Sequence, residues 1–431
     1  MPNWKKYKID ELKANVPNAI AIGPFGSRIK TENFVSHGVP VIRGNNLKDS
    51  RFVDSDFVFV TGKKAEELKS SIAFPNDLIF THRGTLGQVG IIPQNSKYKR
   101  YIVSQSQMKM TCDPKKVNPM FLYYFFKSPQ GLHELLKNAS GTGVPAIASP
   151  LTSLKSIEVP VPPISVQNRI VEILCSLDDK IELNRRMNET LEQMAMALYK
   201  HWFVDFGPFQ DGEFVESEMG MIPQGWTVQE LGNLVSIQTS SVNPAKNEES
   251  QFLHYSIPAY DEQMRPKLEK GLEIKSNKYL IKRNSILVSK LNPETYRIWT
   301  VFAEPSQYER ICSTEFIVYE PKNENAWAFL NAYFRDDSFK NEFRSHAAGT
   351  TGSRQRVAPR KTLEFKLVVP PDSVLEQFNR ICSDYYKIQN KNIRENEMLT
   401  ETRDYLLPRL LSGEIEVRKA EEQVEEVLAN A

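Results

Sequence analysis

Two segments of the sequence share the same pattern of residues, and this similarity is the basis of the fold prediction. Residues 349–371 read GTTGSRQRVAPRKTLEFKLVVPP, and residues 140–163 read SGTGVPAIASPLTSLKSIEVPVPP. Both contain Gly-Thr near the start and end on Val-Pro-Pro, but only the later copy fills its loop with arginine and lysine. The identical residues predict that both segments have the same backbone structure. The different loop residues between them predict that the two loops contact different ligand groups.

The two segments belong to an internal repeat that covers most of the chain. Gly349-Thr350 matches Gly141-Thr142 at one offset (349 − 141 = 208), and the same offset relates the two Pro-Pro pairs. Further identical pairs share this offset without a gap: Phe121 with Phe329, Leu122 with Leu330, Phe126 with Phe334, Glu134 with Glu342 and Ala139 with Ala347. Such self-similarity predicts a duplicated unit.

Each half is predicted to begin with a mixed part of strands and short helices. Short runs of β-branched and aromatic residues, separated by Gly, Pro and Asn, are typical of strands. The predicted strands are residues 39–42, 57–60, 78–81 and 89–92 in the first half, and 285–288, 300–303 and 315–319 in the second. Asn118-Pro119, Ser128-Pro129 and Asp336-Asp337 have the chemistry of helix starts.

A long amphipathic helix is predicted after each Pro-Pro pair. Apolar residues there recur at spacings of four and three, which is the pattern of a coiled-coil seam. The seam residues are Ile170, Leu174, Leu177, Ile181, Leu191, Ala195 and Leu198, with polar Asn184 and Asn188, and then Ile381, Tyr385, Ile388, Leu399 and Leu406, with polar Asn392 and Glu395. The alternative is a core helix of a globular domain.

The predicted fold class is therefore α+β, with two duplicated, mixed α/β heads separated by two long helices that form an antiparallel coiled coil. Residues 166–199 would span about 50 Å as a helix. Antiparallel packing would relate the two halves by an approximate two-fold axis within one chain.

Composition narrows the class of protein. The chain has 431 residues, 40% of them hydrophobic, and a formal net charge of only +2. No apolar run approaches the roughly 20 residues that a membrane span needs. The beginning, MPNWKKYKIDEL, lacks the apolar core of a signal peptide, so we expect a cytoplasmic protein without membrane contact.

The sequence lacks the common signatures of catalysis and of metal binding. Its four cysteines and six histidines are scattered without the spacing of metal ligands. No phosphate-binding loop or dinucleotide-binding glycine motif is present. NPETY (residues 292–296) lacks the second proline of a methyltransferase loop. A chain with two related but diverged heads on a rigid spacer is better suited to binding than to catalysis. Such a chain could recognise two separated sites on one long ligand, such as DNA.

Several short motifs, taken in order, resemble a known family. They are VPVPPISVQNRI (159–170), WFVDF (202–206), GMIPQGW (220–226), VVPPDSVLEQFNRI (368–381) and YLLPRLLSGEI (405–415). With these motifs in a duplicated chain, the sequence resembles the specificity (S) subunits of type I restriction–modification systems. The resemblance covers essentially the whole chain.

The resemblance implies a non-catalytic DNA-recognition subunit. Two target-recognition domains would each read one part of an asymmetric, bipartite sequence in double-stranded DNA. The helices would act as a ruler for the gap between those parts and would dock two methyltransferase (M) subunits, through which restriction (R) subunits join. S-adenosylmethionine, ATP and Mg²⁺ would be bound by these partner subunits, and no cofactor by this chain.

In these terms the predicted domains follow one another along the chain. Residues 1–160 form the first target-recognition domain, and residues 161–218 form the central helical region with its linker. Residues 219–372 form the second target-recognition domain, and residues 373–431 form the C-terminal helical region with an acidic tail.

Arg, Lys, Asn, Gln, Ser and Thr on loops are the residue types that contact DNA. The candidates in the first head are Arg28, Lys30, Arg43, Asn45, Asn46, Arg83, Ser140 and Thr142. Those in the second are Lys290, Asn292, Arg297, Ser353, Arg354, Gln355, Arg356, Arg360 and Lys361. The alternative for any single cation is a solvated surface charge, and the 353–361 cluster is the favoured contact. No catalytic or metal-binding residue is predicted.

Three other functions stay open at this point. The chain could be a freestanding DNA-binding regulator without an enzyme partner, or a coiled-coil scaffold without a DNA function. It could also serve a system in which methylation and cleavage share one polypeptide.

Overall fold

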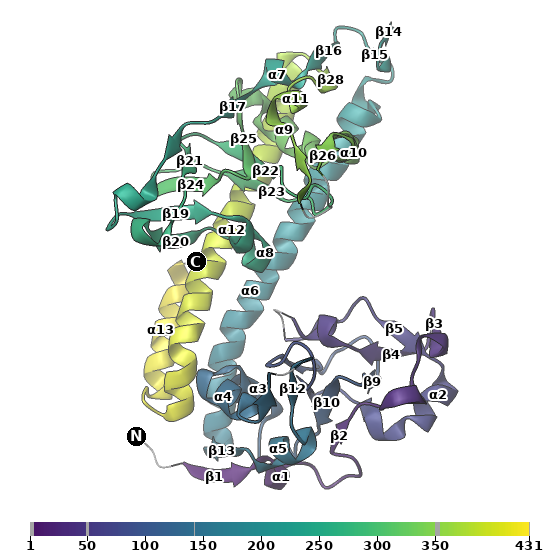
Figure 1. The fold of residues 1–431 in the computed structure, drawn as a ribbon, viewed down its shortest axis with the longest axis vertical. Coiled ribbons are helices and arrows are strands. Elements are labelled where there is room, and N and C mark those ends of the chain that lie inside the picture. The colour runs from purple at the N-terminus through teal and green to yellow at the C-terminus, as the bar shows by residue number, and fades with distance from the viewer. Residues whose placement is uncertain (1–3, 49–50, 142, 350–353, 431) are drawn as a thin grey trace. The chain divides into compact units, whose positions relative to one another are not determined.

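The computed structural model describes residues 4–48, 51–141, 143–349 and 354–430 (Figure 1). The chain divides into two compact units. Unit 1 is Met1–Leu183 with Glu395–Ala431, and unit 2 is Asn184–Arg394. Each unit therefore contains one head, part of helix α6 (Ile164–Tyr199) and part of helix α12 (Asp372–Ser412).

The head of unit 1, called head 1 below, is built on two sheets. The first is antiparallel, in the order β2 (Ile20–Ile22), β10 (Gln107–Met110), β7 (Leu78–Thr81), β8 (Val89–Ile91). The second has the order β3 (Phe34–Val35), β5 (Val58–Val60), β4 (Val39–Ile42), β9 (Tyr101–Val103), β6 (Ile72–Ala73), and its β4 and β9 are parallel.

The head of unit 2, head 2, is also built on a four-stranded and a five-stranded sheet. Its four-stranded sheet has the order β17 (Val235–Gln238), β25 (Phe316–Pro321), β22 (Ser285–Ser289), β23 (Ile298–Val301). Its five-stranded sheet has the order β18 (Ser241–Val242), β21 (Lys278–Ile281), β24 (Glu309–Ser313), β19 (Gln251–Tyr255), β20 (Lys267–Lys270), with β19 and β24 parallel. The order β5-β4-β9-β6 recurs as β20-β19-β24-β21, but the short strands β3 and β18 lie at opposite edges of their sheets. The predicted duplication is therefore confirmed for the strand order of both sheets except at this edge strand.

The loop that the two repeated segments share forms a β-hairpin in both heads. Strand β11 (Ala139–Ser140) pairs with β12 (Ala146–Ile147), and β26 (Ala347–Ala348) pairs with β27 (Arg356–Val357). The second loop is two residues longer, and helix α11 (Pro359–Thr362) is correspondingly shorter than α5 (Pro150–Ser156). The gapless alignment was wrong at this point, because an insertion in the loop is offset by a deletion in the helix.

The offset is restored at the closing strands, where β13 (Glu158–Val161) pairs with β1 (Lys5–Lys8) and β28 (Lys366–Val369) pairs with β16 (Thr227–Glu230). In both halves the Pro-Pro pair follows at once and a long helix begins directly after it. Since proline cannot donate to a strand ladder, the pair separates the last strand from the helix as predicted.

The predicted helix starts are confirmed by their caps. The Asn118 side chain accepts a hydrogen bond from the Met120 N–H at the start of α3 (Pro119–Lys127). The Ser128 hydroxyl does the same for Gly131 in α4 (Pro129–Leu136), and Asp336 caps α10 (Asp337–Ser345). These contacts satisfy N–H groups that have no partner inside the helix.

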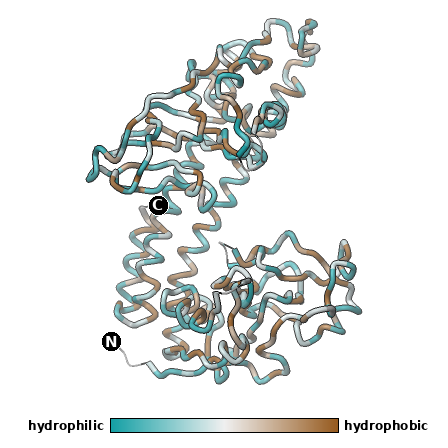
Figure 2. Tube along the Cα trace, in the orientation of Figure 1, coloured by the Kyte–Doolittle hydropathy of each residue, from teal (hydrophilic) through white to brown (hydrophobic). Residues whose placement is uncertain are grey.

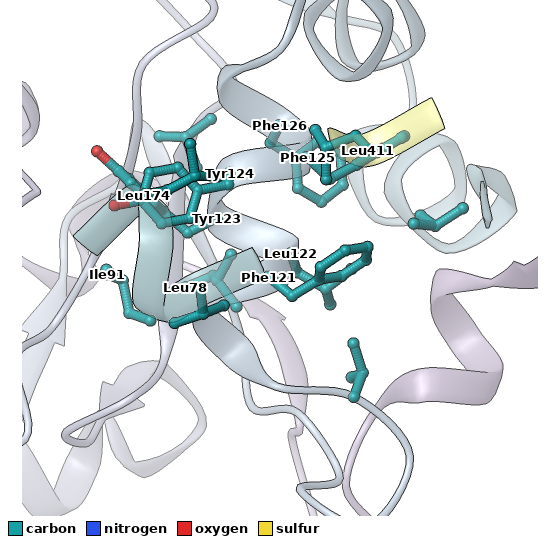
Figure 3. Packing of buried hydrophobic residues seen from close by; sticks show 14 of the residues in the cluster. Leu78, Ile91, Phe121, Leu122, Tyr123, Tyr124, Phe125, Phe126, Leu174 and Leu411 are labelled. Atoms are coloured by element: carbon teal, nitrogen blue, oxygen red, sulfur yellow. The ribbon is translucent and has the colours of Figure 1, made fainter. Parts of the chain in front are cut away.

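The core of unit 1 joins head 1 to both long helices. Aromatic residues of α3 pack with Leu174 of α6 and Leu411 of α12 (Figure 3). The Tyr124 hydroxyl donates to Asp178 at 2.7 Å, and the Arg403 guanidinium binds the same carboxylate at 2.9 Å. Burial raises the pKa of Tyr124, which keeps this hydroxyl protonated.

The core of unit 2 contains the last part of α6 and the first part of α12. Ala195 and Tyr199 near the end of α6 pack in one cluster with Leu375 and Phe378 near the start of α12. Unit 1 instead combines the first part of α6 with the last part of α12. The two helices are therefore antiparallel within each unit, as predicted.

The predicted seam is correct in α6 and partly wrong in α12. Ile170, Leu174, Leu177 and Ile181 are buried, and so are Leu399 and Leu406. However, Ile381 and Ile388 are 40% and 41% exposed, while Phe378, Cys382 and Tyr386 are buried in their place. The prediction chose Ile381 and Ile388 because isoleucine is strongly apolar. In the structure, head 2 and α6 instead cover the neighbouring face of α12, which carries Phe378, Cys382 and Tyr386.

Polar residues of the seam bind one another inside each unit. In unit 1, Lys180 and Glu395 form an ion pair at 2.8 Å. In unit 2, the Asn392 amide donates to the Asn188 side-chain oxygen at 2.8 Å, and the Gln389 amide donates to the Asn188 backbone oxygen at 2.7 Å. Such contacts favour one register of the helices over its neighbours.

Both long helices mix hydrophilic and hydrophobic residues along their length (Figure 2). Among the described residues, no helix is both long enough and apolar enough to cross a membrane.

Candidate nucleic-acid interface

Backbone hydrogen bonds join two loops of head 2 into one surface. The Asn292 N–H donates to the Gln355 oxygen at 2.9 Å, and the Val357 N–H donates to the Lys290 oxygen at 3.1 Å. Asn292 has a φ of 50°, a left-handed conformation that asparagine tolerates better than most residues. The structure thus brings Lys290 and Asn292 beside the β26–β27 hairpin, which the sequence separates by more than 60 positions.

Head 1 has the same frame at the end of β7. The Gly84 N–H donates to the Pro145 oxygen at 2.8 Å, and the Ile147 N–H donates to the His82 oxygen at 2.9 Å. Arg83 forms an isolated bridge with Ala146, at the place where Leu291 bridges Arg356 in head 2. Arg83 and Ser140 are both exposed on this surface.

A shallow groove of about 370 Å³ extends the candidate surface of head 1. Lys30 and Arg43 line it together with the polar segment 104–107. A ring nitrogen of His82 lies 3.1 Å from the Gln105 oxygen, which connects the groove to the Arg83 loop. Burial lowers the pKa of His82, so this histidine adds no charge near pH 7.

The predicted residues Arg28 and Asn45 are exposed near this groove, two residues from Lys30 and Arg43 respectively. Sequence reasoning missed Gln105 and Gln107, which also line it. The sequence feature that could have indicated them is the polar run SQSQ at 104–107, which lies between two more apolar segments.

The cations of the 353–361 cluster are not equivalent. The Arg356 guanidinium donates two hydrogen bonds to the Glu315 carboxylate, at 3.0 and 3.1 Å. This carboxylate raises the pKa of Arg356. Lys361 pairs with Glu364 at 3.0 Å. In the described part of the chain Arg354 and Arg360 form no ion pair, so they are the cations most available to an anionic ligand.

Two predicted contacts have structural roles. Asn46 is 1% exposed, and its amide donates to the backbone oxygens of Val53 and Ser55 at 3.0 and 2.9 Å. Arg297 is 9% exposed and holds Asp261 through two hydrogen bonds at 2.6 and 2.9 Å. Neither side chain reaches a ligand in this conformation, so we leave both out of the interface proposed below. Thr142 and Ser353 lie outside the described residues.

No group of three or more His, Cys, Asp or Glu residues in the described ranges could hold a metal ion. All four cysteines are free, and burial raises the pKa of each thiol.

The chain is similar to proteins of one family. Residues 3–193 match the family model described as the type I restriction modification DNA specificity domain. The chain is 27% identical over 377 residues to the type I restriction enzyme MjaIX specificity subunit of Methanocaldococcus jannaschii, which covers 84% of this chain and 82% of that protein. It is 23% identical over 495 residues to the HindI specificity subunit of Haemophilus influenzae, covering 96% and 100% of the two chains.

A solved structure has the same fold. The type I restriction-modification S subunit from M. genitalium superposes with a TM-score of 0.53 at 17% identity, over 95% of this chain and 96% of that one. The relatives that this chain resembles over most of its length carry the name of type I restriction enzyme specificity subunits, and residues 3–193 match the DNA specificity domain of these systems.

Proposed function

We propose that this chain reads an asymmetric, two-part sequence in double-stranded DNA, one part with each head. The observation that carries this proposal is the pair of equivalent surfaces described above. Both heads hold a hairpin against the loop after an equivalent strand, β7 or β22. The surface of head 1 presents Arg83, whereas that of head 2 presents Lys290 and Arg354. Because the side chains differ on a common frame, the two heads would recognise different base sequences.

The proposed DNA contacts of head 1 are the exposed or half-exposed residues of its surface, namely Arg28, Lys30, Arg43, Asn45, Arg83 and Ser140. Those of head 2 are Lys290, Asn292, Arg354, Gln355, Arg356, Arg360 and Lys361. Arg356 and Lys361 would have to exchange their carboxylate partners for phosphate, so they contribute less than Arg354 and Arg360. Thr142 and Ser353 remain predictions from the sequence.

The long helices are proposed to set the gap between the two parts and to dock two M subunits, which in turn bind R subunits. Both helices expose large apolar residues, and methionine and aromatic residues are enriched at protein–protein interfaces. In unit 1 the exposed apolar residues of the helices are Ile164, Leu183, Met398 and Tyr405, and in unit 2 they are Met187, Met194, Ile381, Ile388 and Ile393. The partner subunits would supply S-adenosylmethionine, ATP and Mg²⁺.

Selection from random duplex DNA tests the reading of a two-part target. The chain, purified with its M subunits, is mixed with a pool of random duplexes, and the bound molecules are sequenced over several rounds. The expected product is a pair of unlike short motifs at one fixed spacing. A single continuous motif, or enrichment without any motif, would contradict the proposal.

A further inference from the structure

Unit 2 contains a pocket at one end of β22, and the proposed DNA surface of head 2 lies at the other end of that strand. Its volume is about 580 Å³. Lys282, Arg283 and Asn284 line it immediately before β22 begins, whereas Lys290 follows the end of that strand. Sites for small molecules typically have volumes of about 300–1,000 Å³, so the pocket has the size of such a site.

The lining of this pocket is positively charged. It contains four cations, Lys282, Arg283, Lys322 and Lys387, and one carboxylate, Glu324. Lys322 donates to the Gly232 oxygen at 2.6 Å, and Lys387 pairs with Asp384 at 3.1 Å.

Lys282 and Arg283 differ from the other two cations of the pocket. Within the described residues their side chains form no ion pair or hydrogen bond, and both residues are exposed. Their charges are therefore available to an anionic ligand without breaking an existing contact.

A buried aromatic ring forms part of the pocket wall. Trp327, at the start of α9 (Trp327–Tyr333), lines the pocket and is only 6% exposed. The ring is therefore held in a fixed position, which gives the pocket a rigid apolar side.

The remaining walls are held in place by hydrogen bonds and ring packing. The Asn284 side chain accepts from the Ala303 N–H at 2.9 Å, and the Asn379 side chain accepts from the Ala328 N–H at 3.1 Å. The rings of Phe302 and Trp327 pack edge to face with centroids 5.6 Å apart. The pocket thus combines an apolar wall with a cationic rim.

We propose that this pocket binds a small molecule of the nucleotide class. The phosphates would lie against Lys282 and Arg283, and the sugar and base would lie against Phe302 and Ala303. A free nucleotide is favoured over the backbone of the recognised DNA, because the pocket and the proposed DNA surface lie at opposite ends of β22. The site is independent of the proposed reading of DNA.

Isothermal titration of the full chain with ADP and with pyrophosphate tests this site. We expect saturable binding of ADP, and weaker binding of pyrophosphate because it lacks the groups that contact the apolar wall. The variant Lys282→Gln plus Arg283→Gln should lose at least tenfold in ADP affinity. The matched control is Lys246→Gln plus Lys275→Gln, two exposed cations of the same head that do not line the pocket and form no ion pair in the described part of the chain. This control should bind ADP as the unaltered chain does.

Three results would overturn the proposal. They are the absence of saturable ADP binding, an equal loss of affinity in the control variant, and full retention of affinity in Lys282→Gln plus Arg283→Gln. A titration in the presence of non-cognate duplex DNA separates the two sources of phosphate. Unchanged ADP affinity supports a separate small-molecule site, whereas displacement of ADP by the duplex would assign the pocket to nucleic-acid phosphates and contradict the proposal. The unfolding temperature of the Lys282→Gln plus Arg283→Gln variant, compared with that of the unaltered chain, shows whether its loss of affinity reflects unfolding.

Discussion

At the scale of single residues, the partner of a side chain decides its role more than its type does. Arg354 and Arg356 lie two positions apart on one exposed hairpin, yet only Arg356 is held by a carboxylate, that of Glu315. Arg297, in the same head, is buried against Asp261. A charge already satisfied by a carboxylate contributes less to binding an anion, since the first contact must be broken or shared.

Arg354→Ala should therefore weaken binding to the selected duplex by about 1–3 kcal/mol, the range for one specific arginine–base contact. Arg356→Ala should cause a smaller loss. Lys270→Ala serves as a control for a paired cation, because Lys270 is exposed in the same head, lies outside the proposed DNA surface and forms an ion pair with Glu249, as Arg356 does with Glu315. Gel shifts at one stated salt concentration measure the three variants. A loss for Lys270→Ala as large as that for Arg354→Ala would show that only overall charge matters.

Sequence reasoning could name arginine and lysine loops but could not separate these roles. Arg297 and Asp261 are 36 positions apart, and Arg356 and Glu315 are 41 apart, so both pairings depend on the fold. Asn46 looked like a base-reading residue, but it closes its own loop through backbone oxygens. The segment 104–107 gave a polar signal that was not used, although it lines the groove of head 1.

At the scale of elements, features set by local chemistry were predictable and features set by packing were not. The caps at Asn118, Ser128 and Asp336 were read directly from the sequence, because a side chain and a backbone N–H two or three residues on form each cap. The seam of α12 was partly wrong, because head 2 determines which face of that helix is covered. That error revealed Ile381 and Ile388 as exposed apolar residues.

Ile381→Asp plus Ile388→Asp should prevent M subunits from co-purifying with the chain, because the change places two charges on the proposed docking face. Folding should be unaffected, since surface substitutions usually change stability by less than about 0.5 kcal/mol. The control is Ser373→Asp plus Gln377→Asp, which adds the same charge at exposed polar positions of α12. Undiminished co-purification of the first variant, with its thermal unfolding unchanged, would place the docking site elsewhere.

At the scale of the whole molecule, the duplication would let one chain read two unlike half-sites, as proposed above. The two heads share the order of the four-stranded sheet, the order of four strands in the other sheet, and a closing strand before a long helix. The offset of the repeat predicted this organisation from the sequence. The grouping of each head with half of each helix required the structure, because it pairs residues more than 200 positions apart, such as Arg403 and Asp178.

The proposed ruler predicts how the gap responds to helix length. Seven residues added to both α6 after Leu183 and α12 after Arg394 keep the seam in phase and lengthen each helix by about 10 Å. The gap between half-sites should grow by about three base pairs, at roughly 3.4 Å per pair. Methylome sequencing reads the gap. As a control, seven Gly and Ser residues inserted between Glu218 and Met219, in the β14 (Phe214–Ser217) to β15 (Gly220–Pro223) turn, should leave it unchanged. A gap insensitive to both insertions would contradict the ruler.

The most direct test of the central claim replaces one head by a copy of the other. Residues 227–369 are exchanged for residues 5–161, because each range runs from the first strand of a head to its closing strand. The chain is expressed with its M subunits in a host without other methylation, and the methylome is sequenced. The unaltered chain should give two unlike half-sites at a fixed gap, and the altered chain should give two inverted copies of the half-site that head 1 reads. An unchanged second half-site in the altered chain would contradict the claim that each head reads its own part of the target.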